Sequence, residues 1–405
     1  MENEFSELTI QITKQISKTT KKEQGIFITP RTIISKLVNR ISPYIDTDRA
    51  YNLLEPSCGT CEIVNFLDKK FNNISIDAVE QNSIIYNSIN LLTFKNRVKL
   101  INNDFIKYKS SKQYDFIFGN PPYVVIDKNN IPNEYAEYIV GRPNLFGLFI
   151  LHSLSMLKVG GILAFIIPKS FLNSAYYSKI RNFMKEDGTI IDIIDFEKDN
   201  NFIDTQQSTF GIIFQKTALI VPVECPYSIK FGDNFMLSDN ATYLREIMNG
   251  STNLKALGLK VKTGNIVWNQ KKSILTSDSS KTLLLYNSNI AKTNSVQLLE
   301  FSNDEKKQYI SMEGSNEPVI IVNRGNGNAA YSLNYAYIDG SRKYLAENHL
   351  NVIYSDTIHG EELKKLFDKI LTSFKNPKTE QFIKMFLGNN GLSKTELETL
   401  FPIFV

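Results

Sequence analysis

Asp115-Phe-Ile-Phe-Gly-Asn-Pro-Pro-Tyr-Val-Val125 is the stretch on which the interpretation of the whole chain depends. A short apolar run that stops at two prolines predicts a buried strand followed at once by a rigid turn. The proline rings fix two φ angles, and they leave carbonyl acceptors without competing N–H donors. The turn also carries one amide side chain, Asn120, and one aromatic ring, Tyr123. A loop of this composition suits a flat ring that bears an amino group.

Strands and helices alternate on both sides of this stretch, which supplies the fourth strand. The apolar patterns predict the other strands over residues 51–55, 74–80, 98–101, 162–168, 190–196 and 209–215. The helical patterns cover about 31–42, 62–71, 81–94, 144–158 and 175–186, with Gly160-Gly161 ending the fourth of these helices. Such alternation, closed by a hairpin, predicts a doubly wound α/β domain over residues 1–220.

The pattern of predicted strands and helices changes after Pro222. Short strands broken by clusters of Asn, Gly and Ser are expected over 225–355, and three short helices over 361–374, 380–386 and 394–400. Residues 221–405 are therefore predicted to form a second domain, of the α+β type.

Composition limits the class of protein. The chain has 405 residues, 42% of them hydrophobic and 22% charged, with a formal net charge of +4. These values are ordinary for a globular protein, and they permit a nucleic-acid partner without demanding one. Three cysteines indicate a reducing compartment, the acidic first residues do not resemble a signal peptide, and no apolar run reaches the roughly 18 residues of a membrane span. We expect a cytoplasmic protein with no membrane segment.

Three acids follow successive predicted strands. Ligands of an open α/β sheet bind beyond the carboxyl ends of the strands, where Glu55, Glu80 and Asp104 are expected. A carboxylate at Glu55 disfavours a pyrophosphate and suits an ammonium or sulfonium group. Glu80 is placed to bind ribose hydroxyls, and Asp104 to accept from an adenine amine. Together they describe S-adenosylmethionine; the alternative is that the acids merely cap helices.

Cys58-Gly-Thr-Cys61 could also be a redox pair or half of a zinc site. The only other cysteine is Cys225, and the chain has three histidines. We therefore predict no metal, and we expect the two cysteines to fill a tight turn beside the cofactor.

Asn120-Pro-Pro-Tyr123 after a hydrophobic strand, together with the acidic strand ends, resembles the N6-adenine DNA methyltransferases. The order of segments, with Thr29-Pro30 first and a recognition domain last, resembles the gamma class and its Taq-type enzymes of type II restriction–modification systems. The resemblance covers residues 25–216 well and the second domain loosely. It implies a Rossmann-like S-adenosylmethionine-dependent methyltransferase domain over 1–220 and a DNA target-recognition domain over 221–405 that closes a DNA cleft.

The resemblance also implies roles for single residues. The Asn120 side-chain oxygen and the Pro121 carbonyl accept the amine hydrogens of a flipped adenine, and Pro122 completes the rigid loop. Tyr123 and Phe202 hold the base. The implied cofactor contacts are Thr29, Glu55, Ser57, Gly59, Glu80, Asp104, Phe105 and Phe149. For Phe149, packing in the core is as good an explanation as contact with the cofactor. For Phe202, packing in the core is also an alternative to contact with the base. Gln81 departs from the pattern, because an apolar residue usually packs on the cofactor adenine there.

In the second domain, Trp268 and Arg324 are candidates for DNA contact, and a solvated turn is the alternative for each. The expected partner is double-stranded DNA, with a separate cognate restriction endonuclease, and the expected state is a monomer.

Two other functions stay open. One is a methyltransferase for RNA or for a protein glutamine, since these enzymes share the tetrapeptide. The other is a DNA-binding specificity module with an inert methyltransferase half, against which the intact tetrapeptide and acids argue.

Overall fold

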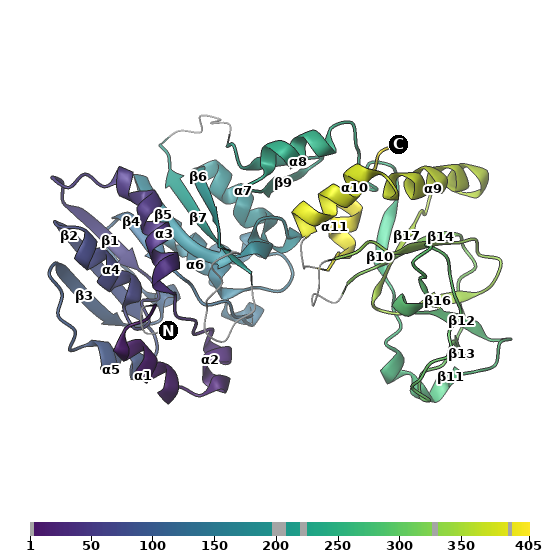
Figure 1. The fold of residues 1–405 in the computed structure, drawn as a ribbon, viewed down its shortest axis with the longest axis horizontal. Helices are drawn as coiled ribbons and strands as arrows, with labels where there is room; N and C mark the ends of the chain where they lie inside the picture. Colours follow the sequence, from purple (N-terminus) through teal and green to yellow (C-terminus); the bar gives the residue numbers. More distant parts are fainter. Residues whose placement is uncertain (1–3, 197–207, 219–224, 326–330, 388–390) are drawn as a thin grey trace. The chain divides into compact units, whose positions relative to one another are not determined.

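The computed structural model of the chain describes residues 4–196, 208–218, 225–325, 331–387 and 391–405 (Figure 1). The chain divides into two compact units. The first comprises Met1–Ser228 and Phe235–Ala241, and the second comprises Ile229–Asn234 and Thr242–Val405. A small two-stranded sheet of β8 (Ser228–Phe231) and β9 (Asn234–Leu237) lies where the chain passes between them.

A seven-stranded sheet in the order β3-β2-β1-β4-β5-β7-β6 is the centre of the first unit. All its neighbouring pairs are parallel except those of β7, which runs antiparallel to β5 and to β6. Its strands are β1 (Tyr51–Glu55), β2 (Ile74–Glu80), β3 (Arg97–Asn102), β4 (Tyr114–Gly119), β5 (Leu157–Pro168), β6 (Gly188–Asp195) and β7 (Thr209–Lys216). The predicted doubly wound α/β fold with a closing hairpin is confirmed.

Helices cover both faces of this sheet (Figure 1). Strand side chains alternate between the faces, so that Leu53 and Phe116 join one apolar cluster while their neighbours Leu54 and Ile117 join the other. The first cluster includes residues of α3 (Arg31–Ile41) and α4 (Glu62–Lys70), and the second includes residues of α6 (Leu145–Met156) and α7 (Ser178–Asp187). Because both faces are covered, the central strands β4, β5 and β7 contain continuous apolar buried runs, whereas in the edge strand β3 apolar residues alternate with charged ones.

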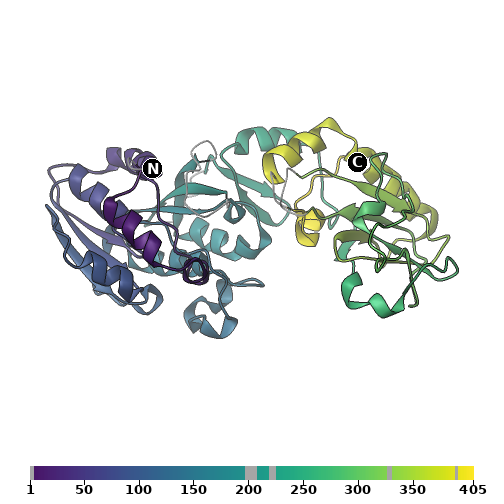
Figure 2. The same ribbon diagram turned by 60° about the horizontal axis from the view of Figure 1, so that its bottom comes forward.

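The N-terminal arm folds back onto the first unit. Its helices are α1 (Glu7–Gln15) and α2 (Lys18–Gln24), and α1 lies beside α5 (Ser83–Ile89) (Figures 1 and 2). Ile12 and Ile16 of this arm form an apolar cluster with Ile85 of α5. This packing brings the segment that follows α2 close to the carboxyl ends of β1 and β2.

Several helix predictions had wrong bounds. The helix after β2 begins at Ser83, because Asn82 accepts from the N–H groups of Ile84 and Ile85, and it ends at Ile89. The helix expected over 144–158 ends at Met156, and Gly160-Gly161 lie inside β5 instead of ending it. The pairing of β4 with β5 is irregular there, and a Cβ on Gly161 would lie 3.0 Å from the Asp115 carbonyl oxygen.

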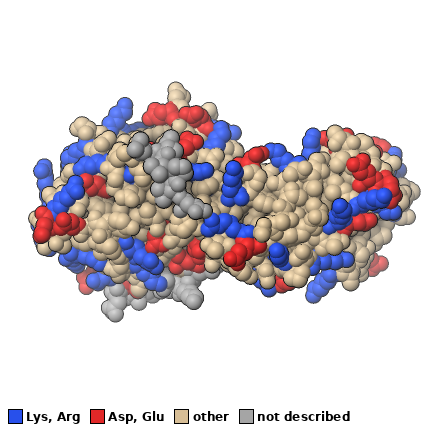
Figure 3. Space-filling model, turned by 90° about the horizontal axis from the view of Figure 1, so that it is seen from above, with Lys and Arg blue, Asp and Glu red and all other residues tan. Residues whose placement is uncertain are grey.

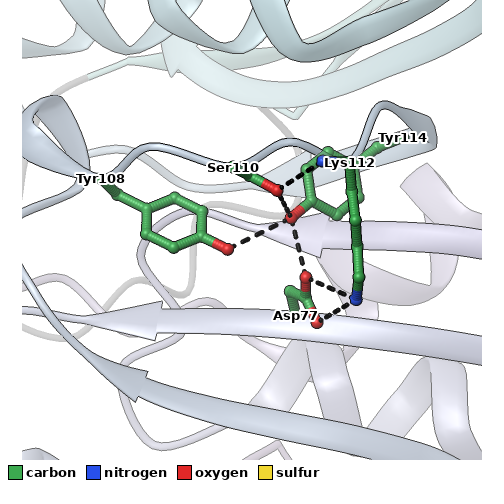
Figure 4. A network of polar contacts seen from close by, with 5 residues as sticks. All are labelled: Asp77, Tyr108, Ser110, Lys112 and Tyr114. Carbon is green, nitrogen blue, oxygen red and sulfur yellow. Dashed lines mark hydrogen bonds and ion pairs between the residues drawn. The ribbon is translucent and has the colours of Figure 1, made fainter.

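A polar network anchors the segment that leads into β4 (Figure 4). The buried carboxylate of Asp77 on β2 accepts from the Tyr114 hydroxyl at 2.8 Å and from Lys112 Nζ at 3.0 and 3.2 Å. Ser110 and Tyr108 in turn contact the Tyr114 hydroxyl, at 3.3 and 3.4 Å. A buried carboxylate needs such partners, and this arrangement holds the start of β4 in place.

Short helical turns occupy several connections of the first unit. These turns are η1 (Ser42–Tyr44), η2 (Phe105–Lys107), η3 (Lys128–Asn130), η4 (Asn133–Tyr138), η5 (Lys169–Phe171) and η6 (Ala175–Tyr177). Two of them, η3 and η4, lie in the long connection between β4 and α6.

The second unit combines two four-stranded sheets with helices, which agrees with the predicted α+β class. The sheets have the orders β10-β17-β14-β15 and β11-β13-β12-β16. Their strands are β10 (Lys260–Thr263), β11 (Leu275–Thr276), β12 (Thr282–Leu285), β13 (Tyr309–Ile310), β14 (Val319–Asn323), β15 (Tyr335–Ile338), β16 (Tyr344–Ala346) and β17 (Leu350–Tyr354). The helices and helical turns are α8 (Ala241–Met248), η8 (Trp268–Gln270), η9 (Lys272–Ile274), η10 (Asn287–Asn289), α9 (Gly360–Phe374), α10 (Pro377–Phe382), η11 (Ile383–Leu387) and α11 (Lys394–Thr399).

The charges on the surface agree with the mild net charge of +4. Acidic and basic side chains are interspersed on the face drawn in Figure 3. Within the described ranges, no helix has both the length and the apolar character needed to cross a membrane.

Candidate active site

A pocket of the first unit lies at the carboxyl ends of β1, β2 and β4. Strand β1 has β2 on one side and β4 on the other, so the strand order reverses at this point. Open α/β sheets bind their ligands at such a switch point. The predicted site residues that line this pocket are Thr29, Glu55, Ser57, Gly59, Glu80, Phe105, Asn120, Pro122 and Phe149.

The carboxyl group of Glu55 has one buried oxygen without a hydrogen-bond partner among the described residues. Glu55 is 2% exposed, and the unpartnered oxygen is Oε2. Burial raises the pKa of Glu55 well above its ordinary value. The backbone N–H of Val64 opposes this change, and the unpartnered Oε2 leaves room for a cationic group from a ligand.

Glu80 has a different environment from Glu55. Its Oε1 accepts from the Asn82 N–H at 2.7 Å, and its Oε2 accepts from the Gly59 N–H at 2.9 Å. Burial raises the pKa of Glu80, and these two N–H groups oppose that change. Each oxygen keeps a second lone pair, so Glu80 can still accept hydrogen bonds from ligand hydroxyls.

A tight loop joins β1 to α4. Gly59 and Cys61 both have left-handed backbone conformations, with φ angles of 51° and 65°. A hydrogen bond with Cys61 and burial raise the pKa of the Cys58 thiol, which is the environment of an unreactive cysteine. No group of three or more His, Cys, Asp or Glu side chains placed to hold a metal ion occurs in the part of the chain that the structure describes.

The third strand end differs from the other two. The Asp104 carboxylate caps the turn that follows it, accepting from the Ile106 N–H at 3.0 Å, and it pairs with Lys107 at 3.5 Å. Asp104 does not line the pocket, whereas Phe105 beside it does. The ring centroids of Phe105 and Phe149 lie 4.8 Å apart and give the pocket an apolar wall. A role of Asp104 toward the cofactor stays a prediction.

The loop after β4 is held by the side chain of Asn120. Asn120 Nδ2 donates to the carbonyl oxygen of Phe27 and to Oγ1 of Thr29, both at 3.1 Å. Asn120 Oδ1 accepts from the Tyr123 hydroxyl at 2.5 Å. The Ser57 hydroxyl donates to the Asn120 carbonyl oxygen at 3.2 Å. The catalytic candidate therefore contacts the cofactor pocket from both its side chain and its backbone.

Tyr123 is half-buried between two aromatic rings. Its ring lies nearly parallel to Phe27 at 6.3 Å between centroids, and it meets Phe146 edge-on at 6.1 Å. Burial raises the pKa of the Tyr123 hydroxyl, so the group stays a hydrogen-bond donor at neutral pH. Pro121 beside it is buried.

The segment Gln24–Ile28 lines the pocket although it was not predicted as part of the site. Asn82, Asn103 and Ile85 were missed as well. Gly25 was a visible signal, because its φ of 64° ends α2 and turns the chain toward the pocket. The sequence did not indicate which other segments of the chain this turn would contact.

The remaining predicted residues lie elsewhere. Phe202 lies outside the described residues. Trp268 of the second unit has Lys306 Nζ 5.7 Å from its ring centroid. Arg324 is half-buried, and its Nη1 donates to the Asn348 carbonyl oxygen at 2.9 Å. DNA contact by Trp268 and Arg324 stays a prediction.

Comparison with known proteins finds relatives of similar length. A model of the family described as "Eco57I restriction-modification methylase" matches residues 8–202. The modification methylase CviBIII of Paramecium bursaria Chlorella virus NC1A is 28% identical over 414 residues, which cover 99% of either chain. The type II methyltransferase M.CvrRI of Paramecium bursaria Chlorella virus XZ-6E is 25% identical over 417 residues, again with 99% of both chains covered.

Among solved structures, a cryo-electron microscopy structure of a DrdV–DNA complex matches 93% of this chain and 54% of its own. The TM-score is 0.53 at 14% sequence identity. At this identity the likeness concerns the fold alone, and it extends over both units.

Proposed function

We propose, for a chain similar to the restriction–modification methylases, that its reaction is methyl transfer from S-adenosylmethionine to N6 of a flipped adenine in double-stranded DNA. DNA methyltransferase activity rests on the family. The choice of adenine N6 rests on the site. The observation that carries it is that one pocket holds both the unpartnered Oε2 of Glu55 and the Asn120 side chain of the Asn-Pro-Pro-Tyr loop.

The residues of the pocket fit the cofactor. S-adenosylmethionine, when bound, supplies an electrophilic methyl group on a sulfonium centre. Glu55 would hold the positively charged amino-acid end, which its unpartnered Oε2 requires. Glu80 would accept from the ribose hydroxyls through its free lone pairs, and Phe105 and Phe149 would pack on the adenine ring.

The catalytic loop would act on the substrate amine by accepting its hydrogens. The lone pair of an adenine amine is delocalised into the ring, which makes the nitrogen a poor nucleophile. Asn120 Oδ1 and the Pro121 carbonyl would each accept one amine hydrogen and draw the nitrogen towards tetrahedral geometry. Positioned dipoles of this kind stabilise a transition state without reorganising during the reaction. The base must leave the duplex first, at a cost of a few kcal/mol.

The main test is transfer of a labelled methyl group from S-adenosylmethionine to unmethylated genomic DNA, followed by nucleoside analysis. We expect the label in N6-methyladenine. Label in a methylated cytosine would contradict the choice of adenine N6 while leaving DNA methylation in place.

The two alternatives give different products. Transfer to RNA or to protein glutamine, with none to duplex DNA, would favour the second enzymatic function. Specific DNA binding without transfer, by a protein that binds the cofactor, would favour a specificity module. A separate restriction endonuclease and a monomeric state stay predictions.

Replacing Tyr123 by Ala is expected to weaken binding of DNA that carries a flipped adenine, because base–aromatic stacking contributes about 1–3 kcal/mol. Tyr123→Phe keeps the ring and should keep most of this affinity. The measurement is the Kd for duplexes with an abasic site or a mismatch opposite the target adenine. Equal affinities for Tyr123→Ala and the unchanged protein would remove the stacking role.

A further inference from the structure

We propose that the segment Gly25–Thr29 positions the catalytic loop by fixing the orientation of the Asn120 amide. The Phe27 carbonyl and the Thr29 hydroxyl accept both Nδ2 hydrogens of Asn120, which leaves Oδ1 as the end that faces the substrate. The proposal rests on the function proposed above. It makes Thr29 a positioning residue in addition to a neighbour of the cofactor.

The orientation of this amide decides whether the loop can work. An Asn side chain has an acceptor end and a donor end, and rotation about its last torsion exchanges them. With the two ends exchanged, the NH₂ group of Asn120 would point at the substrate amine, and two donors would face each other. Some part of the structure must therefore select one orientation.

The partners of Nδ2 make that selection. The Phe27 carbonyl oxygen can only accept a hydrogen bond, so an exchanged Asn120 would put two acceptor oxygens together at that position. Thr29 is 4% exposed, so water has little access to replace its hydroxyl group. The choice of orientation thus follows from the chemistry of the partners.

The segment also contacts the loop at two further places. A Cβ added to Gly25 would lie 2.6 Å from Cγ2 of Val124 and 3.0 Å from Cβ of Pro122, so the glycine backbone lies directly against the loop. The ring of Phe27 lies along that of Tyr123. These contacts hold the accepting groups of the segment at a constant distance from Asn120.

The oxygen end of the amide remains available to a substrate. Tyr123 has one hydroxyl proton but two acceptors, Asn120 Oδ1 at 2.5 Å and the Ile166 carbonyl oxygen at 2.9 Å. When a substrate amine donates to Asn120 Oδ1, Tyr123 can turn its proton to Ile166 and stay satisfied. The loop therefore offers its acceptor without leaving a buried hydroxyl unpaired.

Thr29→Val tests the proposal, since it removes the hydroxyl and keeps the shape. We expect the single-turnover rate of methyl transfer, at saturating S-adenosylmethionine and saturating DNA, to fall about 10- to 100-fold. Thr29→Ser restores the hydroxyl and should stay within about twofold of the unchanged protein. Because Thr29 lines the pocket, cofactor affinity is measured separately by calorimetry. Thr29→Ala, judged by the same rate, replaces the Val variant if that protein does not fold.

Thr20→Val is the matched control, because the Thr20 hydroxyl belongs to the same arm and contacts the exposed Ser17 hydroxyl at 2.8 Å, outside the pocket lining. It should not change the rate. A Thr29→Val rate equal to that of the unchanged protein at saturation would overturn the proposal, whatever the cofactor affinity. Equal slowing by Thr29→Val and Thr29→Ser would overturn it as well. If the unchanged protein makes no N6-methyladenine, the proposed function fails instead.

Discussion

Asn120→Ala is expected to lower the rate of methyl transfer to DNA by at least about 10²–10³-fold, the usual effect of removing one transition-state hydrogen-bonding group. The substitution removes the oxygen that would accept a hydrogen from the substrate amine, and it also removes the Nδ2 group that joins the loop to Phe27 and Thr29. The backbone carbonyl of Asn120, which accepts from Ser57, remains. Cofactor affinity should therefore change by only a few-fold.

The measurement combines single-turnover transfer with calorimetric titration of S-adenosylmethionine. Asn129→Ala is the control, because Asn129 is exposed in the next turn of the chain and should leave the rate unchanged. An active Asn120→Ala protein would refute the assigned role. A protein that has lost both transfer and cofactor binding would show that Asn120 supports the pocket as a whole.

Glu55→Gln is expected to weaken S-adenosylmethionine binding by about 10- to 100-fold, because a hydrogen bond to a charged group contributes about 1.5–3 kcal/mol. The cofactor-free variant should nevertheless unfold at a higher temperature than the unchanged protein at pH 8. Burial penalises the ionised form of Glu55, and its Oε2 has no partner within the described chain to offset that penalty. Function and stability thus make opposite demands on this residue.

The pH dependence follows from the raised pKa of Glu55. The folded protein holds this proton more tightly than the unfolded chain, in which the pKa is near the ordinary 4.5. The contribution of Glu55 to stability is therefore largest below that value, and it decreases as the pH rises towards the raised pKa. Cofactor affinity should show the opposite trend. It falls as the pH falls through the raised pKa, because the protonated carboxyl group no longer attracts a cation.

Thermal unfolding and calorimetry from pH 5 to pH 9 check both trends. Glu23→Gln, at an exposed position of α2 next to the pocket, is the matched control. A Glu55→Gln protein that binds the cofactor as tightly as the unchanged protein would exclude Glu55 as its cationic contact. A variant that is less stable at pH 8 would show that the carboxylate has a stabilising partner.

Much of the site could be predicted because it lies at strand ends. Glu55, Glu80 and Asn120 each follow a strand, and parallel strands of one sheet bring their carboxyl ends to the same edge. Asp104 satisfies the same rule, yet its side chain turns to cap the following turn. Strand order places a backbone position, but the local hydrogen bonds of each strand end decide where the side chain points.

The sequence by itself determined the alternation of strands and helices and the residue types of the Asn-Pro-Pro-Tyr loop, whose catalytic role stays a prediction. These depend on local patterns: apolar periodicity, turn residues, and the residue types within one loop. Only the tertiary structure decided that Gly25–Thr29 lies against Asn120 and Tyr123, and that Oε2 of Glu55 is left without a partner within the described chain. Contacts between segments so far apart in the chain depend on packing of the N-terminal arm, which no short pattern encodes.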